Sequence, residues 1–192
     1  NWRTFDAQAN GLAAHFLDVG LTQQSKIGIY AQNCPEFLVA TFAAFKSAMV
    51  PFNVNYRYGA EEIAYLLDNA DAEAVVFEVR HAPLIASVRD HLPHVKCWIA
   101  ITSDGQIAPD WATALASIPA IAKTLYPPWG RSEGDLFFIY TGGTTGMPKG
   151  VMWRQGDVIG KGGYGALPLT GLPALESPAE AGPRARMLPQ RL

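Results

Sequence analysis

Hydrophobic residues form two different patterns over the first three quarters of the chain. In some stretches they recur every three or four positions, which is typical of helices with one buried face. In others they form short continuous runs, which are typical of strands covered on both faces. The predicted helices cover residues 4–19, 35–49, 61–69, 82–91 and 111–118. The predicted strands cover residues 26–31, 50–54, 74–77, 97–101 and 136–140.

For two of the predicted helices the sequence also indicates how they start or end and how far they are buried. For the helix over 4–19, Thr4 is the candidate N-cap and Gly20 the candidate stop, because a hydroxyl accepts from free first-turn amides and glycine tolerates the left-handed conformation. The helix over 35–49 starts with Pro35, which suits a first turn. Its residues are apolar nearly all round, so we expect it to be buried on most sides.

The alternation of strands and helices predicts the α/β class, with layered, largely parallel sheets and flanking helices. After Trp153 the hydrophobic period is lost, and glycine and proline become frequent. We therefore expect residues 1–157 to belong to one folded domain. Residues 158–192 are expected to be a Gly/Pro-rich continuation, a loop or an end truncated within that domain.

Composition narrows the classes of function. The chain has 15 Lys and Arg against 17 Asp and Glu, and such a balance gives no broad positive field for nucleic acid or an anionic membrane. No signal peptide or membrane-spanning run is visible. The two cysteines, Cys34 and Cys97, form no C-x-x-C pair or Cys/His cluster, so neither a disulfide framework nor a zinc site is indicated. We expect a cytoplasmic protein with a small-molecule substrate and no nucleic-acid partner.

The segment with the clearest chemistry follows the last predicted strand and reads Tyr-Thr-Gly-Gly-Thr-Thr-Gly-Met-Pro-Lys-Gly-Val over 140–151. Glycines let a backbone approach a ligand closely, and successive amides in such a loop can converge on an anion. Threonine hydroxyls and a lysine add donors and a positive charge. We call residues 141–149 the Gly/Thr segment; its candidate phosphate-binding residues are Thr141, Gly142, Gly143, Thr144, Thr145, Gly146 and Lys149.

Two common nucleotide motifs do not fit this segment. The Walker pattern requires Gly-Lys followed by Ser or Thr, whereas Pro148 and Gly150 flank Lys149, which disfavours a Walker-type kinase. The dinucleotide fingerprint requires G-x-G-x-x-G at the start of a helix, and the glycines here are spaced differently. An ordinary Gly/Thr turn between two strands is the alternative without function, and the density of threonines beside a lysine argues against it.

Residues 140–151 resemble the signature loop of the adenylate-forming superfamily, which includes acyl-CoA synthetases, luciferases and peptide-synthetase adenylation domains. The match departs from the usual pattern at one position, where Gly142 replaces a serine and removes one hydroxyl donor. Upstream, residues 33–37 and 50–58 are similar to the N-terminal subdomain of fatty acyl-CoA synthetases. The resemblance covers residues 4–157, and Met152-Trp153-Arg154 is most similar to bacterial synthetases for fatty or steroid-derived acids.

This resemblance implies an incomplete N-terminal part of an AMP-binding adenylation domain. It also implies a two-step reaction, in which a carboxylic acid attacks ATP to give acyl-AMP and pyrophosphate, and CoA then displaces AMP. The implied cofactors and co-substrates are ATP, Mg²⁺ and CoA. On the family pattern the Gly/Thr segment holds the β- and γ-phosphates, Thr144 lies near Mg²⁺, and Lys149 acts catalytically by neutralising charge on the leaving pyrophosphate.

The later motifs of this superfamily, for adenine, ribose and the C-terminal lysine, do not occur in the sequence. We therefore expect this chain alone to complete neither half-reaction, and to self-associate through apolar edges left uncovered. A competing hypothesis is a non-catalytic nucleotide- or partner-binding remnant of such an enzyme. The sequence leaves open whether the acid is a fatty, steroid, aryl or amino acid, and it leaves the oligomeric state open.

Overall fold

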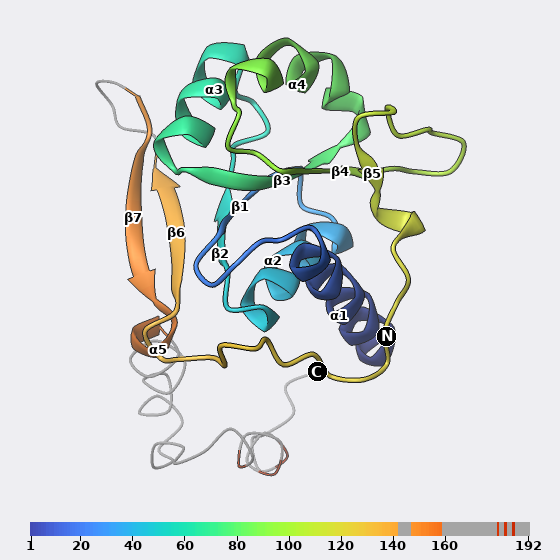
Figure 1. The fold of residues 1–192 in the computed structure, drawn as a ribbon, viewed down its shortest axis with the longest axis vertical. Coiled ribbons are helices and arrows are strands. Elements are labelled where there is room, and N and C mark those ends of the chain that lie inside the picture. The colour runs from blue at the N-terminus through green and yellow to red at the C-terminus, as the bar shows by residue number, and fades with distance from the viewer. Residues whose placement is uncertain (142–146, 159–179, 181–182, 184–185, 187–192) are drawn as a thin grey trace.

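The chain folds into three layers, with helices on both faces of one seven-stranded sheet (Figure 1). The structure, a computed structural model, describes residues 1–141 and 147–158 together with Glu180, Pro183 and Arg186. The described helices and short 3₁₀ turns are α1 (Trp2–Asp18), α2 (Pro35–Lys46), α3 (Ala60–Asn69), η1 (Val79–His81), α4 (Ala82–Val88), η2 (Arg89–His91), η3 (Leu115–Ser117) and α5 (Gln155–Asp157). The described strands are β1 (Lys26–Tyr30), β2 (Val50–Asn53), β3 (Ala72–Glu78), β4 (Cys97–Ile101), β5 (Thr113–Ala114), β6 (Leu136–Thr141) and β7 (Lys149–Arg154).

The strand order in the sheet is β5-β4-β3-β1-β2-β6-β7. Neighbours from β5 to β6 pair in parallel, and only β7 runs antiparallel to its neighbour β6. The predicted α/β class with a largely parallel sheet is therefore confirmed. Strand β7 was not predicted, because its mixture of glycine, basic and apolar residues has neither the continuous nor the alternating hydrophobic pattern of a covered strand.

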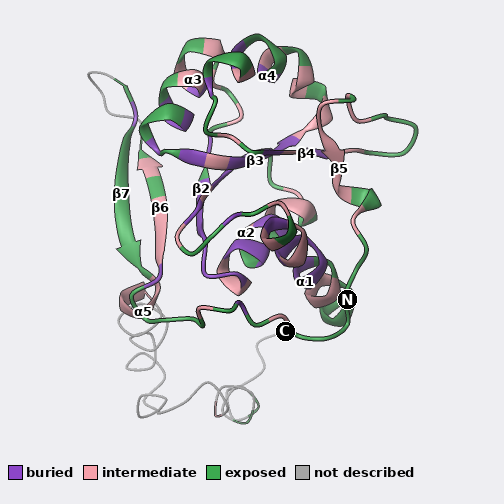
Figure 2. Cartoon of the chain, viewed as in Figure 1, coloured by how far each residue is buried: buried purple, intermediate pink, exposed green. Residues whose placement is uncertain are grey.

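Two hydrophobic cores lie on opposite faces of the sheet. Ile27 and Val76 face the core under α1 and α2, whereas Val75 and Phe77 face the core under α3 and α4. This alternation is the period of two expected for strands, and Figure 2 shows the central strands buried between the layers. The expected burial on both faces thus holds for the central strands. It does not hold for β7, all of whose residues are exposed.

The two ends of helix α1 test the predicted cap and the predicted stop. Its N-cap is Asn1, whose side-chain oxygen accepts from the Thr4 amide at 3.0 Å, so the prediction of Thr4 as N-cap is wrong by one turn. The prediction for Gly20 is confirmed. Gly20 takes a φ of 81°, its amide donates to Leu17, and the next amide donates to Phe16, which is the hydrogen-bond pattern of a Schellman stop.

Helix α2 is less buried than its composition suggested. Val39, Ala40 and Ala43 are buried against the sheet, but Leu38 is 51% exposed and Phe42 43% exposed. The expectation of burial on most sides is wrong because α1 covers only part of this helix. The predicted helix over 111–118 is also wrong: that stretch forms the edge strand β5 and the short turn η3.

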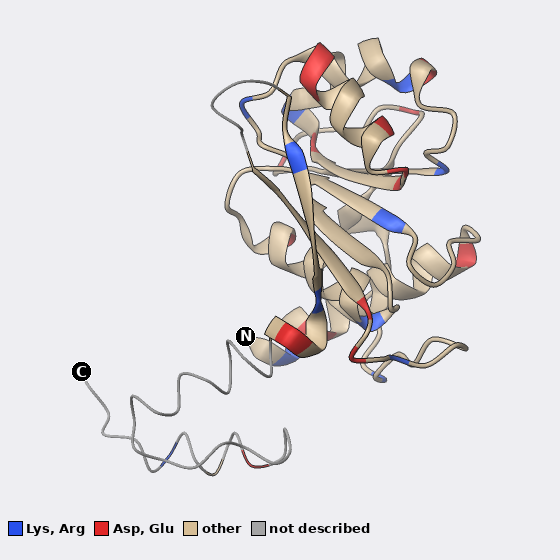
Figure 3. Cartoon of the chain, turned by 90° about the vertical axis from the view of Figure 1, so that its left-hand side faces the viewer, with Lys and Arg blue, Asp and Glu red and all other residues tan. Residues whose placement is uncertain are grey.

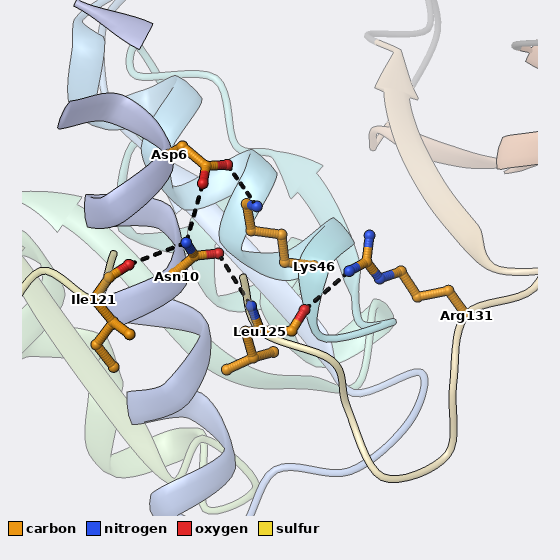
Figure 4. Close-up of polar contacts among 6 residues, drawn as sticks. All are labelled: Asp6, Asn10, Lys46, Ile121, Leu125 and Arg131. Carbon is orange, nitrogen blue, oxygen red and sulfur yellow. Dashed lines mark hydrogen bonds and ion pairs between the residues drawn. The ribbon is translucent and has the colours of Figure 1, made fainter. Parts of the chain in front are cut away.

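The connection from η3 to β6 crosses the outer side of α1, where polar contacts fix it (Figure 4). The buried Asn10 amide group donates to the Ile121 carbonyl at 3.0 Å and accepts from the Leu125 amide at 3.4 Å. Asn10 also donates to Asp6, which pairs with Lys46 of α2 at 2.7 Å. These contacts join both helices to the connection that leads to β6.

Candidate functional site

The hairpin of β6 and β7 carries both ends of the Gly/Thr segment. The two strands pair in register from Leu136 opposite Arg154 to Thr141 opposite Lys149. Because β6 is parallel to β2, Thr141 ends its strand at the carboxyl edge of the parallel sheet. Ligands of open α/β sheets commonly bind beyond this edge.

Of the predicted phosphate-binding residues, the structure brings Thr141 and Lys149 together, as register partners on neighbouring strands. Both are exposed. Within the described part of the chain no carboxylate forms an ion pair with Lys149. The other five candidates, Gly142, Gly143, Thr144, Thr145 and Gly146, lie outside the described residues.

Tyr140, directly before the Gly/Thr segment, is held from three sides. Its hydroxyl donates to the Asn69 side-chain oxygen at 3.0 Å, at the end of α3. Its ring lies 5.7 Å from the Phe52 ring and covers Gly150, where an added Cβ would come within 2.8 Å of the ring. Burial raises the pKa of the Tyr140 hydroxyl, and Tyr65 and Asp71 add to the rise, so this group stays a protonated donor.

Sequence reasoning did not select Tyr140, Gly150 or Asn69 as site residues. For the first two a signal existed, because an aromatic residue and a glycine flank the Gly/Thr segment symmetrically and become cross-strand partners once a hairpin is assumed. Nothing in the sequence around Asn69 distinguishes it from any polar residue at a helix end.

A second group of polar contacts fixes the base of the hairpin. Asp135 is 3% exposed, and its carboxylate accepts from the Gln24 side chain at 3.1 Å and from the Ser132 amide at 2.8 Å. The Asp135 carbonyl accepts from the Gln155 amide, which follows β7, at 2.7 Å. The ends of both hairpin strands are therefore joined to the turn that precedes β1.

The outer part of the hairpin is apolar. A hollow of about 630 Å³ is lined by Phe137, Ile139, Met152 and Trp153 with Arg154, Asp157 and Val158. Figure 3 shows the strands largely free of charge in this region, and the charged positions of β7 are its two ends.

In the described ranges no three metal-ligating side chains gather in one place. No helix of those ranges is both long and apolar enough to cross a membrane.

Comparisons with known proteins agree on one family. A family model described as "AMP-binding enzyme" matches residues 1–165. The chain is 38% identical over 174 residues to the medium-chain acyl-CoA ligase Mig of Mycobacterium avium, covering 87% of this chain and 30% of that protein. It is 37% identical over 156 residues to a 3-oxocholest-4-en-26-oate–CoA ligase of Rhodococcus rhodochrous, covering 80% of this chain and 28% of that protein.

Solved structures give the same picture. The N-terminal domain of FACL13 from Mycobacterium tuberculosis, solved with an inhibitor, matches with a TM-score of 0.69 and 26% identity, over 82% of this chain and 38% of that one. Acetoacetyl-CoA synthetase from Streptomyces lividans matches with a TM-score of 0.75 and 22% identity, over 83% of this chain and 26% of that one; this likeness concerns the fold alone. The chain thus spans about 30% of the length of the curated relatives it matches.

Proposed function

The chain belongs to the AMP-binding enzyme family, and from this premise we propose that it supplies the phosphate-holding part of an acid–CoA ligase. The ligase activates a carboxylic acid with ATP to give acyl-AMP and pyrophosphate, and then transfers the acyl group to CoA. Residues 1–157 form the first part of its adenylation domain, and residues 158–192 continue it.

The observation that carries this proposal is the position of Lys149. It faces Thr141 across the hairpin, at the carboxyl edge of the parallel sheet, and no described carboxylate neutralises it. A lysine ammonium and a threonine hydroxyl on adjacent strand ends can donate to the same phosphate group. Together with the amides and hydroxyls of residues 142–146, they form the proposed site for the β- and γ-phosphates of ATP.

The chemistry expected of these residues is electrostatic. When the acid attacks the α-phosphate, negative charge grows on the departing pyrophosphate, and a positioned ammonium stabilises that charge in the transition state. We assign this role to Lys149. Thr141 orients the phosphate chain, and orientation by fixed groups lowers the barrier without covalent participation of the protein.

Magnesium fits this site as an ion that accompanies ATP. Mg²⁺ keeps several water ligands and commonly binds through the phosphates with few protein groups, so it does not require the kind of acidic cluster that the described residues lack. We assign Thr144 as the hydroxyl nearest to the metal. The ion would then supply charge neutralisation at the phosphates.

For the substrate we propose a fatty or steroid-derived acid. The names of the relatives support this choice: one is a medium-chain acyl-CoA ligase and another a ligase for 3-oxocholest-4-en-26-oate. The uncovered apolar hollow beside β6 and β7 also fits an enzyme that handles apolar acyl groups. We place this enzyme in the cytoplasm, where ATP and CoA are available.

The test is acid-dependent ATP–pyrophosphate exchange by a chimera. The chain is joined to the part of the Mycobacterium avium ligase that it does not match, and exchange is measured with medium-chain and steroid acids. The proposal expects exchange by the chimera, a loss of roughly 100-fold when Lys149 is replaced by alanine, and none by the 192-residue chain alone. A well-folded chimera without exchange would contradict it.

The second candidate is a nucleotide-binding remnant without catalysis, in which the same exposed Thr141 and Lys149 would hold the phosphates. The two functions differ in a direct measurement. A remnant would bind Mg-ATP as the isolated chain but would not restore exchange in the chimera, whereas the ligase part does both.

A further inference from the structure

The end of the hairpin that carries the Gly/Thr segment has little support from the sheet. The parallel pairing of β2 with β6 is confined to Phe52 opposite Phe138. Beyond that pair, Ile139, Tyr140 and Thr141 pair only with β7, which is itself the edge strand. A two-stranded ribbon without a third neighbour is weakly held, so its direction must be fixed by side chains.

Tyr140 makes contacts that reach from this end of the hairpin to the body of the protein. Its hydroxyl donates to Asn69 at 3.0 Å, at the last residue of α3, and α3 is anchored in the core by Ile63, Leu66 and Leu67. The Tyr140 ring is held between Phe52 and Gly150. Since Gly150 has no side chain, the phenol end of the Tyr140 ring fits beside it, one register pair from Thr141 and Lys149.

We propose that Asn69 and Tyr140 are positioning residues, whose hydrogen bond holds the hairpin end so that Thr141 and Lys149 meet the ATP phosphates in one orientation. Asn69 acts through Tyr140 and touches neither phosphate nor acid. The effect of this hydrogen bond on ATP binding rests on the proposed function. The ordering of the hairpin by the hydrogen bond does not depend on nucleotide.

The experiment uses the 192-residue chain and five variants, one of which is a control. Tyr140→Phe removes the donor and keeps the ring, Asn69→Leu removes the acceptor, and Asn69→Asp keeps an acceptor oxygen in place. The double variant Tyr140→Phe/Asn69→Leu completes a thermodynamic cycle. Tyr65→Phe is the matched control, because Tyr65 is an exposed tyrosine of α3 whose hydroxyl has no hydrogen bond within the described residues.

Two measurements are made on each protein. Amide hydrogen exchange without nucleotide reports the order of residues 139–141 and 149–151, and calorimetric titration with Mg-ATP reports affinity. We expect exchange of these amides to become roughly two- to tenfold faster in Tyr140→Phe and in Asn69→Leu, as for the loss of one hydrogen bond. We expect the double variant to match either single variant, Asn69→Asp and Tyr65→Phe to resemble the unmodified chain, and ATP affinity to fall in parallel with protection.

Each other outcome overturns a defined part of the inference. Unchanged exchange in Tyr140→Phe or Asn69→Leu, or additive effects in the double variant, would show that the hydrogen bond does not order the hairpin. Faster exchange with unchanged ATP affinity would show that this order does not position the phosphate ligands. A failure of the unmodified chain to bind Mg-ATP would instead contradict the proposed function, and the exchange data would still decide whether the hydrogen bond orders the hairpin.

Discussion

Thr141 and Lys149 lie directly opposite each other as the last register pair of the β6–β7 hairpin. The segment between them therefore starts and ends at adjacent points, and its two flanking donors face one region of space. A hairpin keeps this arrangement whatever the intervening residues do, because the strand hydrogen bonds fix its two ends. The two backbone positions are thus fixed relative to each other, and on the proposed function this lowers the entropic cost of binding a phosphate chain.

Replacement of Lys149 by methionine should weaken Mg-ATP binding by roughly tenfold or more, which corresponds to the loss of one charge-assisted hydrogen bond of about 1.5–3 kcal/mol. Methionine keeps the length and volume of the side chain, so the fold should be unaffected. Lys123→Met is the control, because Lys123 is also exposed but lies in the connection between η3 and β6. Equal affinities of the two variants in calorimetry would exclude Lys149 from the phosphate site.

Replacement of Gly150 by alanine should destabilise the hairpin. An added Cβ would lie 2.8 Å from Cζ of Tyr140, so the ring must move and its bond to Asn69 must lengthen or break. Overpacking of this kind costs about 1–3 kcal/mol. In urea unfolding, Gly134→Ala is the comparison, because its nearest neighbour would be the Ser132 hydroxyl at 3.4 Å. A Gly150→Ala protein as stable as the Gly134→Ala protein would contradict the assigned packing.

Replacement of Asn10 by leucine should lower the free energy of unfolding by about 2–3 kcal/mol. Leucine has a similar shape, but it removes the part-buried hydrogen bonds to the Asp6 carboxylate, the Ile121 carbonyl and the Leu125 amide, and the loss of each costs about 0.5–1.5 kcal/mol. The exposed Asn33 serves as control with the same substitution. If both variants unfold at the same urea concentration, the Asn10 contacts do not stabilise the connection to β6.

The hydrophobic pattern of the sequence predicted the central strands of the sheet but did not predict its edge strand β7. The continuous apolar run Cys97–Ile101 was predicted to the residue, whereas β3 (Ala72–Glu78) starts two residues before its predicted bounds of 74–77 and ends one residue after them. The exposed strand β7 has no such pattern, and its pairing depends on β6 folding back, which is a tertiary event. The Gly/Thr segment was recognisable from composition, but its support by Asn69 was not, because residues 71 positions apart in sequence meet only in the fold.

Mild acid should destabilise the protein through His15. Burial lowers the pKa of His15 below its ordinary value of 6.5, with a smaller opposing effect of Asp18. The folded state therefore binds fewer protons than the unfolded state between the two pKa values, so stability is present above pH 6.5 and is lost as pH falls through the lowered pKa. His81 acts in the same direction, because burial and Arg80 lower its pKa against the opposing effect of Glu78.

Denaturant unfolding from pH 7.5 to 5 measures this effect. We expect His15→Gln to flatten the decline below pH 6.5, whereas the same change at the exposed His94 should leave it in place. Titration of Asp6 and Glu73 does not contribute to the decline in stability just below pH 6.5. Their pKa values are lowered from 3.8 and 4.5, so their contributions are lost only at a more acidic pH. A decline that is equal in all three proteins would show that His15 is not responsible.

Self-association of the 192-residue chain should proceed through β7. This strand is the edge of the sheet, and Val151 and Trp153 are each 44% exposed on the face that they share with Ile139. An edge strand with free backbone groups and apolar side chains pairs readily with another copy. In sedimentation velocity we expect the average mass to rise with concentration.

Val151→Lys should suppress the rise, because it adds a third positive charge to a strand that already has Lys149 and Arg154 at its ends. Ile107→Lys should not suppress it, although Ile107 is 88% exposed, because an isolated apolar residue in a loop offers no strand to extend. Equal suppression by both variants would indicate a general effect of charge on solubility and would exclude β7 as the specific contact.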